Sequence, residues 1–288
     1  MAEYESIHGT RVKYLSSDPT LDSSTEGQVW YNSVSGTLKS LVQIKAWLSG
    51  GAMATARYGQ AGAGTQTAGL VMTGSLSPSA RTANVESYDG TDWTEVANVN
   101  TMRGYHAGFG TQTAALVAAG YTGDEDSPHH SIDNVEQWDG SSWTEIADVN
   151  TARADMAGTG TTTAGLFFGS RIPGYTGHTE EWNGSAWAEQ NNLINSRGGN
   201  SGNTGTQTDA LTAGGNTPSI IAYAEGYDGT SWSTRPSLAT ARKYLAGFGT
   251  ASSAVVAGGA NPSSSYKNST EEWTGDTAVE TGSTIDFD

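Results

Sequence analysis

The residues with the clearest capacity for chemistry are arginines and glutamates that recur along the chain. Successive arginines of this set lie 46, 50, 44 and 45 residues apart. An arginine fork beside a carboxylate forms either a structural ion pair or, around a central axis, a ring that binds anions. A residue needed in every repeat is more often structural, so we expect Arg–Glu bridges between repeats. The arginines are Arg57, Arg103, Arg153, Arg197 and Arg242, and the glutamates are Glu86, Glu136, Glu181, Glu225 and Glu271.

One insertion carries the side chains that are most like metal ligands. His129 and His130 follow three consecutive acids, Asp124, Glu125 and Asp126. Calcium loops place oxygen ligands at alternate positions, and the acids here are adjacent, so a solvated acidic loop is the preferred interpretation. The chain has no cysteine, which excludes thiolate metal sites and cysteine nucleophiles. With no Ser–His–Asp pattern and no phosphate loop, we predict a protein that is not an enzyme, with no metal and no cofactor.

Tryptophans recur with the same period as the arginines. If exposed, such a ring of indoles would stack on sugars; if buried, each indole would pack where one repeat meets the next. Packing is the preferred interpretation. Trp30 and Trp47 fall outside the full repeats, and we expect them to be exposed or part of an interface. The tryptophans for which we predict a structural role are Trp93, Trp143, Trp187 and Trp232.

Four short strands in each full repeat position these residues. In the second repeat the strands are predicted at residues 107–111, 114–119, 134–138 and 142–147. Asp139-Gly140 is expected to supply the two positive-φ residues of a tight hairpin. Four strands at a period of about 44 to 50 residues are typical of a β-propeller blade. The sequence therefore predicts an all-β fold, a five-bladed β-propeller with a short N-terminal extension.

The repeats, across about residues 51–275, resemble kelch repeats. Paired glycines end the second strand in two copies, Gly214-Gly215 and Gly258-Gly259, and three copies depart from this pattern. The phrase GTQTAALVAAG followed by VEQWDGSSWTE is similar to kelch-like propeller proteins of tailed bacteriophages, especially marine ones, and GQVWYNSVSGTLKSL resembles a segment near the start of phage fibre and structural proteins. This resemblance implies a virion component. The strand-three aromatics that contribute to it are Tyr88, Trp138, Trp182, Tyr227 and Trp273.

The fifth repeat lacks a tryptophan in its fourth strand, because DTAVETGSTIDFD follows EEWTG. Exposed sheet edges favour aggregation, so we expect a strand at residues 37–42 to complete the fifth blade. Alternatively, the C-terminal segment closes its own blade and residues 30–42 attach the protein to a partner. The predicted division is an anchoring or closure segment at residues 1–50 and a propeller at residues 51–288.

The loops between the second and third strands vary from repeat to repeat, whereas the other turns at the opposite end of the sheets are uniform. Loops on a rigid scaffold commonly carry recognition, and tolerated surface variation is the alternative explanation. We predict a contact surface there. Its candidate residues are Tyr121, His129, His130, Arg171, Tyr175, Tyr223, Tyr266 and Lys267.

The formal charge of −16 argues against binding to nucleic acid or to anionic membranes. No apolar run is long enough to span a membrane, and the first residues do not form a secretory signal. We therefore expect a non-enzymatic virion protein on a tail, fibre or capsid, made in the host cytoplasm without a signal peptide. Its N-terminal segment would contact other virion proteins in an oligomeric assembly, and its loops a host glycan or protein. A free glycan-binding lectin is the main alternative, and a carbohydrate-active enzyme is a third.

Overall fold

The protein is described by a computed structural model for residues 12–19, 29–40, 51–123, 130–199, 202–263 and 266–275. Its regular structure in these ranges consists of β-strands, most of them in antiparallel sheets, and no helix long and apolar enough to cross a membrane occurs there. Contacts divide the chain into two units, residues 1–50 and residues 51–288. The prediction of an all-β chain is confirmed, and the arrangement of small sheets is compatible with a β-propeller.

The first unit contains a three-stranded sheet. Strand β2 (Val29–Asn32) pairs in parallel with β1 (Lys13–Leu15) and antiparallel with β3 (Thr37–Ser40). Trp30 is only 3% exposed, and its indole N–H donates to Asp18 Oδ1 at 2.9 Å. The expectation that Trp30 is exposed or in an interface is therefore wrong, because its own small sheet buries it.

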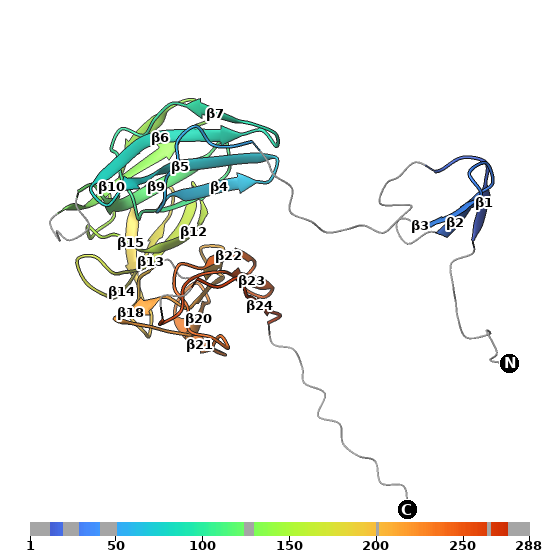
Figure 1. The fold of residues 1–288 in the computed structure, drawn as a ribbon. Coiled ribbons are helices and arrows are strands. Elements are labelled where there is room, and N and C mark those ends of the chain that lie inside the picture. The colour runs from blue at the N-terminus through green and yellow to red at the C-terminus, as the bar shows by residue number, and fades with distance from the viewer. Residues whose placement is uncertain are drawn as a thin grey trace, which may run out of the picture. The chain divides into compact units, whose positions relative to one another are not determined.

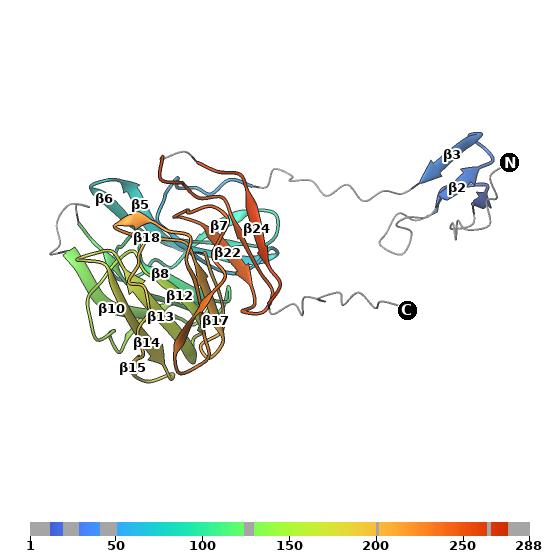
Figure 2. The same ribbon diagram turned by 90° about the horizontal axis from the view of Figure 1, so that it is seen from below.

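The second unit contains five sheets in chain order, which we number first to fifth (Figure 1). Four have four strands in simple up-and-down order, and the described strands of the fifth number three. Successive sheets contact one another through their first strands, and Figure 2 shows the same sheets from below. A short hairpin, β18 (Asn216–Thr217) with β19 (Ser219–Ile220), extends from the fourth sheet. The sheets are β4 (Ala61–Thr65), β5 (Ala68–Ser77), β6 (Ala80–Tyr88) and β7 (Trp93–Val96); β8 (Ala107–Gly110), β9 (Ala115–Tyr121), β10 (Ser131–Trp138) and β11 (Trp143–Ile146); β12 (Ala157–Thr161), β13 (Ala164–Ser170), β14 (Thr176–Trp182) and β15 (Trp187–Gln190); β16 (Gly202–Gly205), β17 (Ala210–Ala213), β20 (Ala224–Tyr227) and β21 (Trp232–Arg235); and β22 (Ala246–Gly249), β23 (Ala254–Ala257) and β24 (Thr270–Trp273).

The second sheet agrees with the four predicted strands to within about three residues at each end, but its last turn differs in mechanism. Only Gly140 has a positive φ there, at 96°. Asp139 instead accepts the backbone N–H groups of Ser141 and Ser142 through Oδ1, at 2.8 Å each. The expected pair of positive-φ residues is wrong, because the aspartate acts through its side chain as an Asx turn.

The core lies between successive sheets. Leu70, Met72 and Val85 of the first sheet pack with Val117 and Trp138 of the second, and equivalent clusters join the second to the third and the third to the fourth. A strand that packs on both faces needs an apolar run without alternation, which explains why β9 is buried along its whole length. Each sheet thus depends on its neighbours for a core, as expected of repeats.

The fifth sheet ends at β24, whose only hydrogen-bonded neighbour among the described strands is β23. The part of the predicted closing strand that the structure describes, residues 37–40, pairs with β2. The segment after Gly275 lies outside the described residues. The predicted fourth strand of this sheet, from residues 37–42 or from the C-terminal segment, therefore stays a prediction.

Candidate functional site

The repeated arginine joins two successive sheets. Arg103 lies in the connection from β7 to β8, and its Nη2 donates to Glu136 Oε1 at 2.6 Å. Its Nη1 donates to the carbonyl oxygens of Ala119 at 3.1 Å and Asn134 at 2.7 Å, all within the second sheet. The backbone carbonyl of Arg103 accepts the N–H of Gly74 in the first sheet. One residue therefore connects both sheets, and both charged side chains are buried.

The same bridge recurs at every repeat, with one correction to the expected pairing. Arg153 Nη2 lies 2.9 Å from Glu180 Oε1, not from Glu181. Glu180 lies two residues before the strand-three aromatic Trp182, as Glu136 lies before Trp138, and a shift of one residue in a strand turns the side chain to the other face. Glu181 instead accepts the hydroxyl of Tyr227. The other bridges are Arg57–Glu86, Arg197–Glu225 and Arg242–Glu271.

Each of these glutamates also holds the connecting segment. The second carboxylate oxygen of Glu136 accepts the N–H of Asn100 at 2.6 Å, three residues before Arg103. Corresponding bonds reach Ala54, Asn150, Ile194 and Ala239, at 2.6 to 2.8 Å across the set. Arginine and glutamate are thus occupied by protein partners, which supports the structural interpretation over an anion-binding ring.

The strand-four tryptophans also bind the preceding sheet. Trp143 Nε1 donates to the carbonyl of Ala97 at 3.0 Å, and Trp187 Nε1 donates to that of Ala147 at 3.0 Å. Trp232 Nε1 donates to Thr179 Oγ1 at 2.9 Å. These three indoles are buried and Trp93 is partly buried. Packing between sheets, rather than stacking on sugars, is what their positions support.

The surface formed by the strand two–three loops and the connections just after each arginine is the candidate site, and we call it the loop face. Isolated bridges hold the two kinds of segment together, for example Gly104 with Tyr121 and Ala154 with Ile172. The variable loops and the connections therefore lie at the same end of the sheets, as the up-and-down order of the strands requires.

The second residue after each arginine forms a chain of contacts from sheet to sheet on this face. Tyr105 N–H donates to the carbonyl of Gly59 at 2.9 Å, Asp155 N–H to that of Tyr105 at 2.7 Å, and Tyr244 N–H to that of Gly199 at 2.9 Å. All five residues have positive φ, a conformation that is costly for non-glycine residues and concentrates at functional sites. Sequence reasoning missed this position, although its constant offset from the arginine marks it.

Asp155 is the buried acid at the centre of this arrangement. Its Oδ2 accepts Arg171 Nε at 2.5 Å, and the arginine side chain stays 30% exposed. Burial raises the pKa of the Asp155 carboxyl, and the charge of Arg171 opposes that shift. Lys243 Nζ lies 4.9 Å from the ring centre of the exposed Tyr244. The buried carboxylate of Asp155 thus holds the partly exposed guanidinium of Arg171 in place on the loop face.

The predicted contact residues differ in how far they reach the surface. Tyr121 is fully buried with Ala154 and Ile172, so its prediction as a surface contact is wrong; it ends β9 and faces the core. His129 lies outside the described residues. Tyr175 is partly buried, and its hydroxyl accepts the amide of Asn216. The remaining five reach the surface to different extents: His130, Arg171, Tyr223, Tyr266 and Lys267.

His106 gives the fold a predicted dependence on pH. It is buried, and desolvation followed by the charge of Arg103 lowers its pKa to about 3. Its stabilising contribution is complete above the unfolded-state pKa of about 6.5 and is lost as pH falls toward 3, because only the unfolded state binds the proton. We expect the loss to reach about 2 kcal/mol at pH 5. Urea unfolding between pH 7 and pH 5 measures it, and a His106→Asn variant with the same pH slope would contradict the assignment.

No protein-family model matches the chain, and no curated protein matches its sequence. Within the described ranges, no group of three or more His, Cys, Asp or Glu side chains is placed to hold a metal ion.

Proposed function

We propose that the protein is a five-bladed kelch-like propeller that serves as a non-enzymatic structural protein of a bacteriophage virion. In this proposal the five sheets are its blades, and the loop face contacts the host surface or another virion protein. The resemblance of the repeats and of residues 27–41 to phage proteins supports the virion assignment. The acidic charge and the lack of cysteine are compatible with it.

One observation carries the binding role. The charged residues that recur in every repeat bind one another inside the fold and are not available to a ligand, as the buried Arg103–Glu136 bridge illustrates. Prominent exposed groups that differ between repeats lie on the loop face, where Tyr223 is 50% exposed and Tyr266 is 88% exposed. A constant scaffold with variable, exposed aromatics is the usual design of a recognition surface.

The first unit suits an anchoring role. Its sheet has its own buried side chain in Trp30 and its own ion pair between Lys39 and Asp18, at 2.6 Å. It also exposes apolar side chains, among them Tyr14 and Leu38, which suit contact with a neighbouring virion protein in an oligomeric assembly. Proteomics of purified particles tests this assignment, and absence of the protein from them would remove it.

A free glycan-binding lectin is the second candidate, because exposed tyrosines such as Tyr223, Tyr244 and Tyr266 offer flat faces for sugar stacking. A glycan array with the isolated protein separates the two candidates. Saturable binding to one glycan by a protein that is absent from particles would favour the lectin, whereas incorporation into particles favours the virion role.

Removal of two loop-face tyrosines is expected to weaken attachment. A Tyr223→Ala/Tyr266→Ala double variant should lower the adsorption of particles to host cells by roughly tenfold or more, because exposed aromatic anchors commonly contribute 1–2 kcal/mol each to an interface. The matched control is Thr230→Ala, an exposed turn residue at the opposite end of the fourth sheet. Equal adsorption by the double variant and the control, at equal incorporation, would contradict a binding role for this face.

A further inference from the structure

The loop face of the third, fourth and fifth sheets differs in charge from the rest of the chain. The whole chain carries a formal charge of −16, but in the loop-face segments of these three sheets the single acid is the buried Asp155. The same segments supply three cations, Arg171, Lys243 and Lys267. This sector of an acidic protein is therefore cationic, which favours an anionic partner. The segments are residues 154–156, 171–175, 198–201, 214–223, 243–245 and 258–269.

A pair of glycines brings two of these cations to one place. A Cβ added at Gly198 would lie 2.6 Å from the Cβ of Arg171, and one added at Gly199 would lie 3.6 Å from the Cβ of Lys243. Gly199 also has a φ of 80°, a conformation that glycine adopts without strain. The other bridge arginines are followed by at most one glycine in the next two positions. The connection after the bridge arginine of the fourth sheet thus accommodates a cation from each neighbouring sheet.

The guanidinium of Arg171 is fixed through one of its nitrogens. Its Nε donates to Asp155 Oδ2 at 2.5 Å, and Asp155 is fully buried. Burial disfavours the charged form of Arg171, but the charge of Asp155 raises its pKa above the ordinary value. No described residue accepts a hydrogen bond from the two Nη groups, and the side chain is 30% exposed. An oriented, charged fork is therefore available to an acceptor from outside the chain.

Two tyrosines and a lysine lie beside this guanidinium. After burial and the aspartate, the hydroxyls of Tyr244 and Tyr175 are the next groups that affect the pKa of Arg171, so both lie near it. Lys243 Nζ lies 4.9 Å from the ring centre of Tyr244, which is 41% exposed. Lys243 forms no ion pair with a described acid. The site thus combines two cations, phenol hydroxyls and an exposed aromatic ring within the second unit.

We propose that the site formed by Arg171, Lys243 and Tyr244 binds the carboxylate-bearing ring of an acidic saccharide. The carboxylate would accept from the Nη groups of Arg171, whose planar fork matches two carboxylate oxygens. Lys243 would add a second positive charge, and the ring of Tyr244 would pack against the sugar. The inference rests on the proposed role of the loop face as a contact surface and narrows its ligand to one chemical class. It applies to a virion protein and to a free lectin alike.

A saccharide fits these groups better than an acidic peptide does. The backbone at the site is already paired, since Gly198 bridges Asn216 and Lys243 bridges Ala260. A peptide that binds by adding a strand needs a free sheet edge. A sugar ring needs an exposed aromatic face and side-chain donors, and those are the groups that the site presents.

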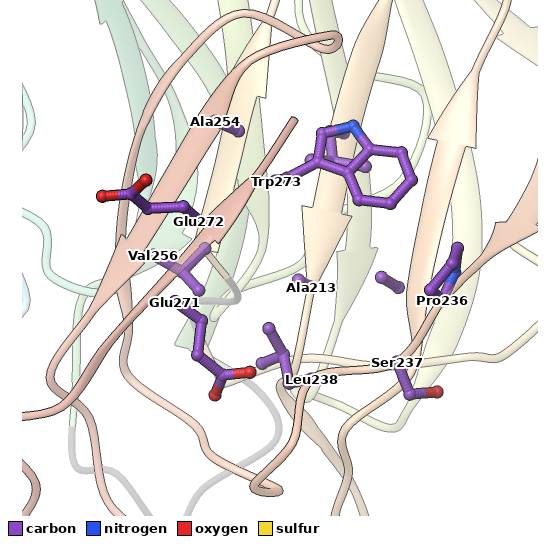
Figure 3. Close-up of a pocket in the computed structure, with 11 residues that line it drawn as sticks. Ala213, Pro236, Ser237, Leu238, Ala254, Val256, Glu271, Glu272 and Trp273 are labelled. Carbon is purple, nitrogen blue, oxygen red and sulfur yellow. The ribbon is translucent and has the colours of Figure 1, made fainter. Parts of the chain in front are cut away.

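The cavity between the fourth and fifth sheets does not suit an anion. It has a volume of about 180 Å³, and its apolar lining includes Leu238, Val256 and Trp273. Figure 3 shows Glu271 and Glu272 among the residues around it. Apolar walls do not compensate a buried charge, and carboxylates repel a ligand of the same sign. The acidic saccharide is therefore assigned to the loop face and not to this cavity.

Titration with charged sugars and their neutral counterparts tests the proposal. The acidic probes are an oligogalacturonate and sialyllactose, and the neutral ones are the methyl ester of the oligogalacturonate and lactose. Calorimetry of the full chain at low salt should show binding of an acidic probe at least about tenfold tighter than its neutral counterpart, and added salt should weaken it. Equal affinities within both pairs, binding of no probe, or equally tight binding of a polyglutamate peptide would overturn the proposal.

Three variants locate the site. Lys243→Gln should weaken binding of the acidic probe by about fivefold, and Arg171→Gln combined with Asp155→Asn, which removes both members of the ion pair, by about tenfold or more. Arg235→Gln is the matched control: it removes the same charge from β21, where Arg235 Nη1 donates to Ser233 Oγ, and affinity should not change. Lys243→Gln decides the test if the double variant unfolds. Equal losses from Lys243→Gln and Arg235→Gln would reduce the effect to net charge and overturn the site.

Failure of this inference is distinguishable from failure of the proposed function. If the Tyr223→Ala/Tyr266→Ala particles lose adsorption while the protein binds neither acidic probe, the loop face remains a contact surface and the acidic saccharide is rejected. If the protein binds an acidic probe through Lys243 but is absent from particles, the virion role is rejected and the site remains.

Discussion

An Arg103→Ala variant is expected to be less stable than the unsubstituted protein by about 3–5 kcal/mol, because it leaves a carboxylate buried without its partner. Glu136 has its charged oxygen 2.6 Å from the arginine, and the carbonyls of Ala119 and Asn134 would lose the same donor. For a domain of this size the loss corresponds to a fall in Tm of about 10 °C. Thermal unfolding followed by circular dichroism measures it.

Two further variants separate loss of the charge from loss of the bridge. Arg103→Lys keeps the charge but not the planar guanidinium, which donates to four acceptors, so it should recover little of the stability. Arg103→Met combined with Glu136→Leu removes both charges and should be more stable than Arg103→Ala, since an apolar pair often replaces a buried ion pair at little cost. A single arginine substitution that leaves Tm unchanged would show that the bridges do not hold the sheets together.

A Gly110→Ala variant is expected to be less stable by about 3 kcal/mol, through backbone strain and overpacking together. Gly110 has a φ of 125°, and an added Cβ would lie 2.3 Å from the carbonyl oxygen of Ala114 across the turn between β8 and β9. The turn cannot open without breaking the N–H bond from Thr111 to the same carbonyl. Chemical denaturation gives the change in free energy of unfolding.

Gly174→Ala is the control for this substitution. No heavy atom lies within 4 Å of a Cβ added at Gly174, and its φ is not in the left-handed region. We expect its effect on stability to stay within about 0.5 kcal/mol, as for ordinary surface substitutions. Equal losses in the two variants would mean that the turn glycine is not conformationally required.

The repeat period was enough to predict the strands, because turn chemistry and apolar runs agree with it in every copy. The strands of the second sheet lie where the sequence placed them, and the arginines and most of the tryptophans are buried as expected. The structural role of the repeated residues is predictable because the same ion pair and the same packing contact are needed in each repeat. Their roles follow from position in the repeat rather than from any one copy.

The predictions from sequence are wrong where the position of a single residue decides which way a side chain faces. Glu180 and Glu181 cannot be told apart by residue type, and only their distance from Trp182 assigns each side chain to a face of the strand. Tyr121 stands at the start of a variable loop in the sequence, which favours a surface position, yet β9 extends through it and buries it. The chain of contacts through Asp155 depends on positive φ values. Outside glycine, residue type does not predict a positive φ.

The most direct test of a virion scaffold that presents a recognition face is cryo-EM of the protein in its native particle. We predict that the loop face, marked by Tyr223 and Tyr266, points away from the particle and that strands β1, β2 and β3 contact a neighbouring subunit. A loop face packed against the particle, or a particle that lacks the protein, would contradict it.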